Sequence, residues 1–326
     1  METILVTGGA GYIGSHICKA LKTAGFLPVV FDNFSHGHEW AAAFGPTVRG
    51  DLQNRDDLDK AFTEYSPRAV IHLAASIHLR ESIEKPLLHY QNNVMGTLSL
   101  LSAMADHGIS ELVFSSSAAV YAPPEYLPID EKHPKGPMNP YGKTKWMCEQ
   151  IIQDFSVAHG LKAVCLRYFN AAGADPEGQI GEAHDPETHV IPRLLFTAQG
   201  KQPHFTIYSS KLPTPDGTAV RDYIHVTDLA SGHLCALKLL PSLKGAEAFN
   251  LGTGHGYSVL EMHEEAQKVT GFSIPLKHEE RNIAESPSLV ADPKKAKEQL
   301  GWTPEYSDLS TIIETAWNWH NIPVLV

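Results

Sequence analysis

Short apolar runs alternate with longer stretches of helical spacing through the first half of the chain. The runs TILVTG, PVVFDN, AVIHLAA, ELVFSSS and AVCLRYFN are rich in β-branched residues and predict strands. Between them, the stretches 12–24, 86–106 and 140–159 place apolar residues at helical intervals and predict helices. Such alternation requires right-handed crossovers and a sheet covered by helices on both faces. We therefore predict an α/β fold built on a doubly wound parallel sheet.

The pattern changes after residue 170, where glycine and proline interrupt the chain and only short strands and helices are indicated. We predict one domain over 1–170 and a smaller, mixed α/β domain over 171–326. Residues near 221–240 read as a strand and a helix, and they could return to the first domain.

Composition narrows the class of protein. The 26 basic and 37 acidic residues give a net charge of −11, which argues against nucleic acid as the main partner. No run of 18 apolar residues predicts a membrane span, and the N-terminus runs into ILVTG without a signal-peptide pattern, so we expect a soluble intracellular protein. The four cysteines lack metal-like spacing, so we expect buried free thiols and no metal site: Cys18, Cys148, Cys165 and Cys235.

A glycine-rich turn links the first predicted strand to the first helix. In VTGGAGYIGSH, Gly8, Gly11 and Gly14 permit a tight turn, and the helix that follows offers free N–H groups to a pyrophosphate. Asp32 ends the second strand, where a carboxylate can accept both hydroxyls of an adenosine ribose and would repel a 2′-phosphate. The turn and Asp32 together predict a Rossmann-type site for NAD. Asp51 is either an acceptor for the adenine amino group or part of a surface turn.

A second motif, NPYGKTK, offers acid–base chemistry. Asn139 caps a helix and Pro140 fits its first turn, so that Tyr141 and Lys145 lie one helical turn apart on one face. A nearby ammonium and an oxidised nicotinamide would lower the pKa of the phenol. Ser117 ends the strand at the sheet edge where ligands of such folds bind, and its hydroxyl could share a proton with Tyr141. An exposed helical pair is the alternative for the motif taken alone.

These motifs, with NNVMGT, FSSSAAVY, LRYFNAAGA, VRDYIHVTDLA and FNLGTG, resemble those of the extended short-chain dehydrogenase/reductases over nearly the whole chain. Within them the chain is most similar to the branch of UDP-sugar 4-epimerases. The resemblance implies tightly bound NAD, interconversion of UDP-glucose and UDP-galactose through a 4-keto sugar, and a cytoplasmic homodimer.

The resemblance also implies residue roles. Ser117, Tyr141 and Lys145 would carry the proton chemistry. Besides the three glycines, the expected cofactor contacts are Tyr12, Ile13, Asp32, Asn33, Asp51, Leu52, Asn92, Lys145 and Phe169. The expected substrate contacts are Ser117, Tyr141, Asn170, Tyr208, Arg221, Arg281, Glu285 and Leu289. For Asn93, packing of a helix against the sheet is an equal alternative.

Related enzymes with other activities carry different residues at these positions. Sugar-nucleotide 4,6-dehydratases carry Thr-Asp-Glu where this chain has Ser117-Ala118-Ala119, so the carboxyl groups that dehydration needs are missing. The sequence leaves two other activities as alternatives. One is 4-epimerisation of UDP-N-acetylhexosamines or UDP-pentoses, and the other is that of a nucleotide-sugar dehydrogenase or reductase. An intact Ser117, Tyr141 and Lys145 argues against a non-catalytic sensor.

Three places bear on ligand contacts, and two of them depart from the family. Ser76-Ile77-His78 replaces a run whose lysine neighbours the cofactor, so one positive contact is lost or is supplied by His78 or Arg80. Asn282 stands where the family has an arginine, which weakens the prediction of UDP affinity. Leu289 occupies the position that borders the sugar's 2-substituent, and its size predicts weak use of N-acetylated sugars.

Overall fold

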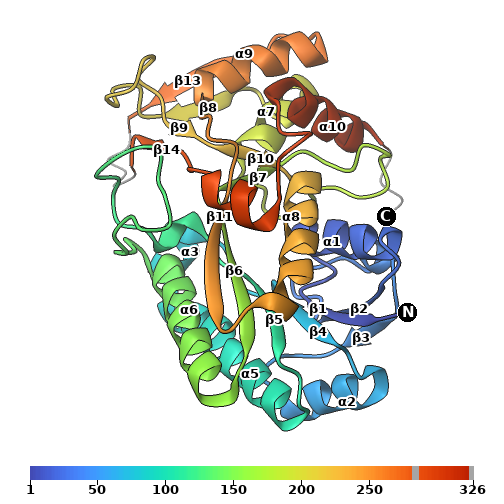
Figure 1. The fold of residues 1–326 in the computed structure, drawn as a ribbon. Coiled ribbons are helices and arrows are strands. Elements are labelled where there is room, and N and C mark those ends of the chain that lie inside the picture. Colours follow the sequence, from blue (N-terminus) through green and yellow to red (C-terminus); the bar gives the residue numbers. More distant parts are fainter. Residues whose placement is uncertain (281–285, 323–326) are drawn as a thin grey trace.

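The central element of the computed structural model, which describes residues 1–280 and 286–322, is a seven-stranded parallel sheet (Figure 1). Its strand order is β11-β6-β5-β4-β1-β2-β3. The strands are β1 (Thr3–Thr7), β2 (Leu27–Asp32), β3 (Thr47–Arg49), β4 (Ala69–His72), β5 (Glu111–Ser115), β6 (Lys162–Tyr168) and β11 (Ala246–Leu251). The order reverses direction between β1 and β4, and ligands of such sheets bind at the carboxyl ends of the strands near that point. The predicted doubly wound fold is confirmed.

Helices cover both faces of the sheet because successive side chains of each strand point to opposite sides. Ile4 and Val6 of β1 pack in the cluster that contains α1 and α8, whereas Leu5 packs on the other face. The first face is covered by α1 (Tyr12–Thr23) and α8 (Val226–Leu239), and the second by α2 (Arg55–Tyr65), α5 (Gly96–Asp106) and α6 (Pro140–His159). The parallel strands are therefore buried on both sides, as their continuous apolar sequences predict.

The main sheet also takes in part of the sequence that we expected in the second domain. α8 packs against α1, and β11 pairs in parallel with β6 as the last strand. Strand pairing therefore joins residues 246–251 to the main sheet, and the division into two domains near residue 170 stays a prediction. The glutamate and asparagine of β11 hid the strand pattern of AEAFNL.

The rest of the C-terminal half packs around a separate apolar cluster, at the top of Figure 1. Its helices are α7 (Val190–Ala198), α9 (Val259–Thr270) and α10 (Leu309–Asn321). Its short strands are β7 (Asn170–Ala172), β8 (Phe205–Tyr208), β9 (Val220–Arg221), β10 (Tyr223–His225), β12 (Tyr257–Ser258), β13 (Leu276–Glu279) and β14 (Ser288–Leu289). These strands form small separate sheets, which fits the predicted mixed α/β character.

The helix expected over 86–106 is present, with a π-helical turn inside it. It begins as α4 (Pro86–His89), widens to a π-helical turn at Tyr90–Met95, labelled η2, and continues as α5. Such wide turns occur at functional sites because they re-aim side chains. Here the wide turn carries Asn92 and Asn93.

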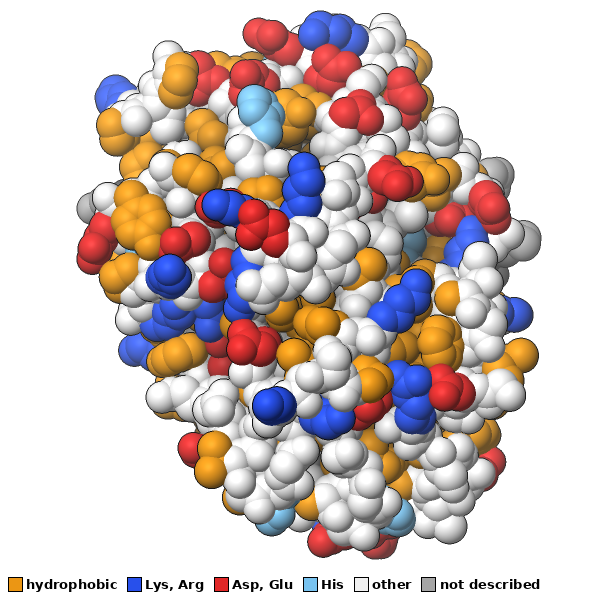
Figure 2. Space-filling model, in the orientation of Figure 1, with side chains coloured by type: hydrophobic (Ala, Val, Ile, Leu, Met, Phe, Trp, Pro, Cys, Tyr) orange, Lys and Arg blue, Asp and Glu red, His pale blue; other side chains and the backbone are white. Residues whose placement is uncertain are grey.

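The remaining short helices are η1 (Glu39–Ala42), α3 (Leu79–Glu84), η3 (Ala118–Val120), η4 (Leu240–Ser242) and η5 (Ala296–Leu300). Among the described helices, none combines the length and the apolar character needed to cross a bilayer. The four cysteines are free thiols, and all but Cys235 are buried. Acidic and basic side chains are interspersed over the face in Figure 2, unlike the continuous basic stripe typical of nucleic-acid binding.

Candidate active site

The glycine-rich turn brings backbone very close to backbone. Gly8 has a φ of +73°, which favours glycine, and a Cβ at Gly14 would overlap the Gly8 carbonyl oxygen. α1 then begins at Tyr12, and its N-cap residue Gly11 makes no side-chain cap. The first N–H groups of α1 therefore have no acceptor within the helix and can bind an anion such as a pyrophosphate.

Asp32 lies beside this turn at the end of β2. Its Oδ2 accepts a hydrogen bond from Ala10 N at 3.0 Å and its Oδ1 accepts one from Phe34 N at 2.9 Å. Each carboxylate oxygen keeps a second acceptor site, which suits the two hydroxyls of an adenosine ribose. The turn and Asp32 therefore fit NAD, which would be held by this carboxylate and by the start of α1.

Other expected cofactor contacts are already engaged within the protein. Asn33 Nδ2 donates to Asp51 Oδ2 at 3.0 Å, and Asp51 Oδ1 accepts from Gln53 N at 2.8 Å, which agrees with the surface-turn alternative for Asp51. The Leu52 side chain is buried in the core, and the Tyr12 hydroxyl donates to Gly173 O. The Leu52 side chain and the Tyr12 hydroxyl are therefore engaged within the protein. Their roles as cofactor contacts stay predictions.

The structure brings Ser117, Tyr141 and Lys145 together at the carboxyl end of β5. Asn139 Oδ1 accepts from Gly142 N at 2.8 Å and caps α6, as predicted. The Tyr141 hydroxyl lies close enough to Ser117 for that side chain to influence its pKa, and Ser117 Oγ accepts from Ala119 N at 3.1 Å. Lys145 is buried, and its Nζ donates to Ser115 O at 2.7 Å. The motif is therefore not an exposed helical pair.

Burial controls the protonation of this group. Burial raises the pKa of Tyr141 above its usual value, and the hydrogen bond from Ser117 lowers it in part. Burial also lowers the pKa of Lys145 to about 8, so the ammonium persists at neutral pH. Lys145 Nζ donates to the Ser115 carbonyl and not to the phenol, so the activation of Tyr141 by this ammonium stays a prediction.

A buried ion pair that the sequence analysis missed supports this group. Arg167 Nε donates to Glu149 Oε1 at 2.9 Å, Arg167 Nη2 contacts Glu149 Oε2, and Ser116 Oγ donates to Glu149 Oε1. The pair ties α6 to β6 and to the residue before Ser117. The spacing places Glu149 on the helix face of Tyr141 and Lys145, because the three residues follow one another at intervals of four on α6, but it does not identify Arg167 as the partner.

The wide turn of η2 makes a second set of supporting contacts. Asn93 Oδ1 accepts from Ser76 N at 2.8 Å, and Asn93 Nδ2 donates to Thr144 Oγ1 at 2.9 Å. Asn93 therefore has the structural role that we held as its alternative. Asn92 Nδ2 donates to Ser76 Oγ at 2.8 Å. Asn92 is part-exposed next to these contacts, and its contact with the cofactor stays a prediction.

The replacements for the family's lysine lie in different surroundings. Arg80 is exposed and pairs with Glu84 at 3.2 Å, so it points away from the site. His78 is the N-cap residue of α3 but makes no side-chain cap, and its ring contacts those of His36 and His184 at centroid distances of 6.0 and 6.4 Å. Burial lowers the pKa of His78, which opposes a positive charge there, so a replacement for the lysine stays a prediction.

Substrate-side residues converge where the two parts of the chain meet. Leu289 of β14 pairs with Arg221 of β9 and packs on the cluster around Val120, beside Phe169. Asn170 N donates to Asp222 O at 3.1 Å, at the start of β7. This groups Leu289, Arg221, Phe169 and Asn170 near the turn that follows Ser117. Tyr208 ends β8, while Arg281, Asn282 and Glu285 lie outside the described residues.

Asp222 holds this region together and was not singled out from the sequence. Its side chain is fully buried and accepts hydrogen bonds from Thr253 N at 2.9 Å, from Gly254 N at 3.1 Å and from Ala291 N at 3.2 Å. Burial raises the pKa of Asp222 even though these donors lower it. The carboxylate joins the loop after β11 to the strand that carries Leu289.

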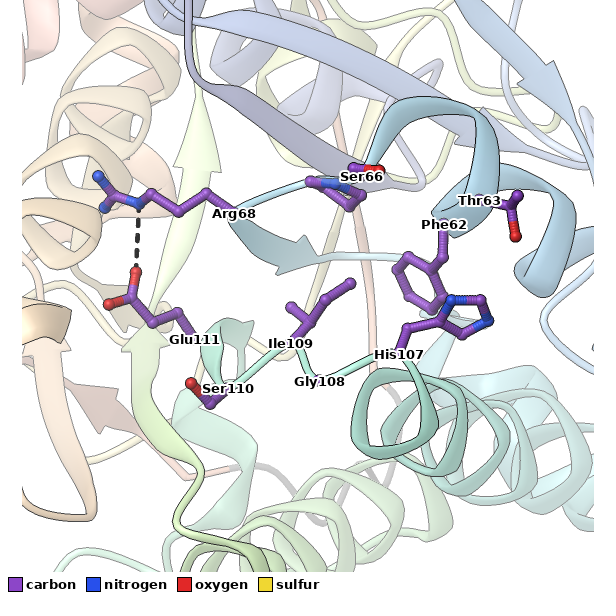
Figure 3. A pocket seen from close by; sticks show the side chains of 10 residues that line it. Phe62, Thr63, Ser66, Arg68, His107, Gly108, Ile109, Ser110 and Glu111 are labelled. Carbon is purple, nitrogen blue, oxygen red and sulfur yellow. Dashed lines mark ion pairs between the residues drawn. The ribbon is translucent and has the colours of Figure 1, made fainter.

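A hollow of 590 Å³ lies at the opposite end of the sheet (Figure 3). It is lined by the loops that precede β4 and β5, where Arg68 Nε and Glu111 Oε2 form an ion pair at 3.3 Å. Ligands of doubly wound sheets bind at the carboxyl ends of the strands, so this hollow is not the expected site. The expected site is the group around Tyr141.

The fold and this group define a Rossmann-type, nucleotide-dependent enzyme with a serine–tyrosine–lysine acid–base set. The chain belongs to the NAD dependent epimerase/dehydratase family, whose sequence model matches residues 4–252. It is 49% identical to the UDP-glucose 4-epimerase of Rhizobium meliloti (strain 1021) over 98% of this chain and 97% of that protein.

Solved structures agree with the fold. The UDP-glucose 4-epimerase from Brucella ovis in complex with NAD superimposes with a TM-score of 0.95 at 47% identity, covering 97% of this chain and 98% of that chain. The enzyme from Bifidobacterium longum in complex with NAD+ and UDP gives a TM-score of 0.92 at 36% identity, covering 98% of both chains.

Proposed function

We propose that this chain is a 4-epimerase that interconverts UDP-glucose and UDP-galactose by reversible, NAD-dependent oxidation at the sugar C4 atom. The observation that carries the proposal is a part-buried phenol, Tyr141, that lies beside the Ser117 hydroxyl, with Ala118 and Ala119 next to Ser117 in the chain. These alanines supply no carboxyl group, so the site can move the proton of a hydroxyl but cannot remove water by the dehydratase route. The names of the similar proteins support the same activity.

The side chains handle the proton. Tyr141, as phenolate, takes the proton from the 4-hydroxyl, and Ser117 holds that hydroxyl in hydrogen-bonding reach. The Lys145 ammonium lies on the same face of α6 and stabilises negative charge on the phenol. Bound NAD supplies what these groups cannot, which is acceptance and return of a hydride. When the 4-keto sugar has turned over in the site, Tyr141 returns the proton to O4.

The substrate-side residues have separate tasks in this proposal. Arg221 binds the diphosphate, because a guanidinium can donate two parallel hydrogen bonds to it, and Asn170 orients the nucleotide sugar. Leu289 borders the 2-substituent and favours UDP-glucose and UDP-galactose over N-acetylated sugars. Firm contacts on UDP and few on the sugar allow the ketone to turn over.

The experiment has two parts. Denaturing the purified protein should release NAD in near-stoichiometric amount, because the reaction returns its hydride in every cycle. Tyr141→Phe should lower turnover of UDP-galactose by at least about a hundredfold, while UDP binding persists. Tyr126→Phe is the matched control, because that hydroxyl lies on the surface and donates to Asp130. Recovery of empty protein that needs added NADP, or more than a third of the activity in Tyr141→Phe, contradicts the proposal.

Two finer points belong to the proposal and rest on the family resemblance. We infer that the protein works as a homodimer in the cytoplasm. Light scattering of the purified protein with NAD measures the first point, and a monomer at micromolar concentration contradicts it.

A further inference from the structure

Four potential metal ligands meet in the loop between β7 and α7. Nitrogen or oxygen atoms of Glu182, His184, Glu187 and His189 all lie within 4.8 Å of one another. Nδ1 of His184 is 2.9 Å and Nδ1 of His189 is 2.7 Å from Glu182 Oε1, and Nδ1 of His189 is 3.0 Å from Glu187 Oε1. Ligand atoms about 2.0–2.1 Å from a tetrahedral zinc ion stand roughly 3.3 Å apart, so a small outward movement would admit the ion.

One buried ligand atom in this cluster has no partner. The Glu182 and Glu187 side chains are each 6% exposed, and Glu187 Oε2 has no hydrogen bond. That oxygen lies 4.0 Å from His184 Nδ1, so it faces the other ligands. A buried carboxylate oxygen without a donor is costly, and a cation at this point would satisfy it.

The charges of the cluster also favour a bound cation. Two buried carboxylates lie against two imidazole rings whose centroids are 5.1 Å apart, so two negative charges share a small volume. A divalent ion balances both carboxylates while both imidazoles stay neutral, which is the form that binds metal.

We propose that Glu182, His184, Glu187 and His189 form a closed, four-ligand site for a divalent transition metal of the zinc type. Imidazole and carboxylate are ligands of zinc, and four protein ligands leave no open position, so the role is structural rather than catalytic. The sequence analysis expected no metal site because it considered only cysteine spacing. The segment EAHDPETH does contain the pattern, since it holds two glutamates and two histidines within eight residues.

The neighbours of the cluster show what the metal would hold. Trp319 Nε1 donates to Glu182 O at 2.8 Å, and His38 Nε2 donates to Ala183 O at 2.8 Å. The Tyr12 ring meets the His184 ring edge-on at 6.2 Å, and the Tyr12 hydroxyl donates to Gly173 O at the other end of the loop. A metal here would hold this loop against α10 and against the start of α1, next to the glycine-rich turn.

The test measures metal rather than turnover. Protein dialysed against EDTA and then against buffer is titrated with zinc chloride by calorimetry, and metal content is measured by mass spectrometry. We expect about one zinc ion per chain and a higher Tm with zinc. Glu187→Gln keeps the side-chain size but removes the charge, and it should weaken zinc binding at least about a hundredfold, as should His184→Ala. His159→Ala, an exposed histidine at the end of α6, should bind zinc like the unaltered protein.

Cobalt chloride gives an independent readout, because a tetrahedral cobalt site produces strong visible absorption. Absence of zinc uptake by the unaltered protein overturns the proposal, and so does equal uptake by Glu187→Gln. If His184→Ala fails to fold, Glu187→Gln alone decides. A closed proton-bridged cluster predicts no cobalt spectrum and no change of Tm with zinc.

Discussion

The buried ion pair between Glu149 and Arg167 gives a sharp prediction about stability. Each side chain is 5% exposed, and Glu149 accepts from Arg167 and from Ser116. Glu149→Gln leaves the guanidinium buried without its counter-charge, and its remaining side-chain acceptors are neutral: one amide oxygen and the Tyr121 hydroxyl, which lies at 3.1 Å. Breaking one partner of a buried pair costs about 3–5 kcal/mol. For a chain of 326 residues, whose unfolding entropy is about 0.7 kcal/mol per kelvin, Tm should fall by about 4–7 °C.

The double variant separates the charge effect from packing. In Glu149→Met with Arg167→Met no charge is buried, and such replacements are often neutral or stabilising by about 1–4 kcal/mol. We therefore expect the double variant to be more stable than Glu149→Gln. Chemical denaturation followed by circular dichroism, with NAD at one fixed concentration, measures both. A loss below about 1 kcal/mol in Glu149→Gln, or a double variant less stable than the single one, refutes the reasoning.

Three further predictions concern the cofactor turn, substrate range and acid stability. Gly14→Ala should lose bound NAD, because its Cβ would overlap the Gly8 carbonyl; NAD retained through gel filtration contradicts this. Leu289→Ser should raise the rate on UDP-N-acetylglucosamine relative to UDP-glucose by roughly 10- to 100-fold, measured by coupled assay; an unchanged ratio removes Leu289 from this role. Burial lowers the pKa of His72 to about 3 and of His233 to about 4, so each adds stability that is complete above pH about 6.5 and is lost as pH falls towards those values. Near pH 5 each such histidine should add about 1.4 kcal/mol per pH unit to the slope of unfolding free energy, and His233→Gln should remove one such share; an unchanged slope contradicts it.

The parts of the site that follow from local pattern were predictable from the sequence. Ser117 ends a strand, and Tyr141 and Lys145 share a helix face, so strand ends and helical spacing suffice to bring them together. The Gly8–Gly14 turn and Asp32 follow in the same way.

Long-range partners were not predictable by the same means. Arg167 sits within an apolar strand, and its pairing with Glu149 depends on how α6 lies across the sheet, which spacing along one segment does not give. In the sequence Asp222 looks like a surface charge, because its hydrogen-bond partners become neighbours only when β9, β11 and β14 come together in the fold. Asn93 reads as a ligand contact until the wide turn of η2 aims it at Ser76 and Thr144.

The position of β11 has a consequence for how the protein is made. The sheet strand that covers β6 is synthesised 78 residues after β6 ends at Tyr168, since β11 begins at Ala246. Until then the growing chain would expose β6 as an unpaired edge, which is prone to pairing with other chains. A fragment that stops near residue 170 would keep that edge permanently. We expect such a fragment to aggregate. We also expect that cutting the chain between its two parts, by protease or by truncation, destroys the main sheet.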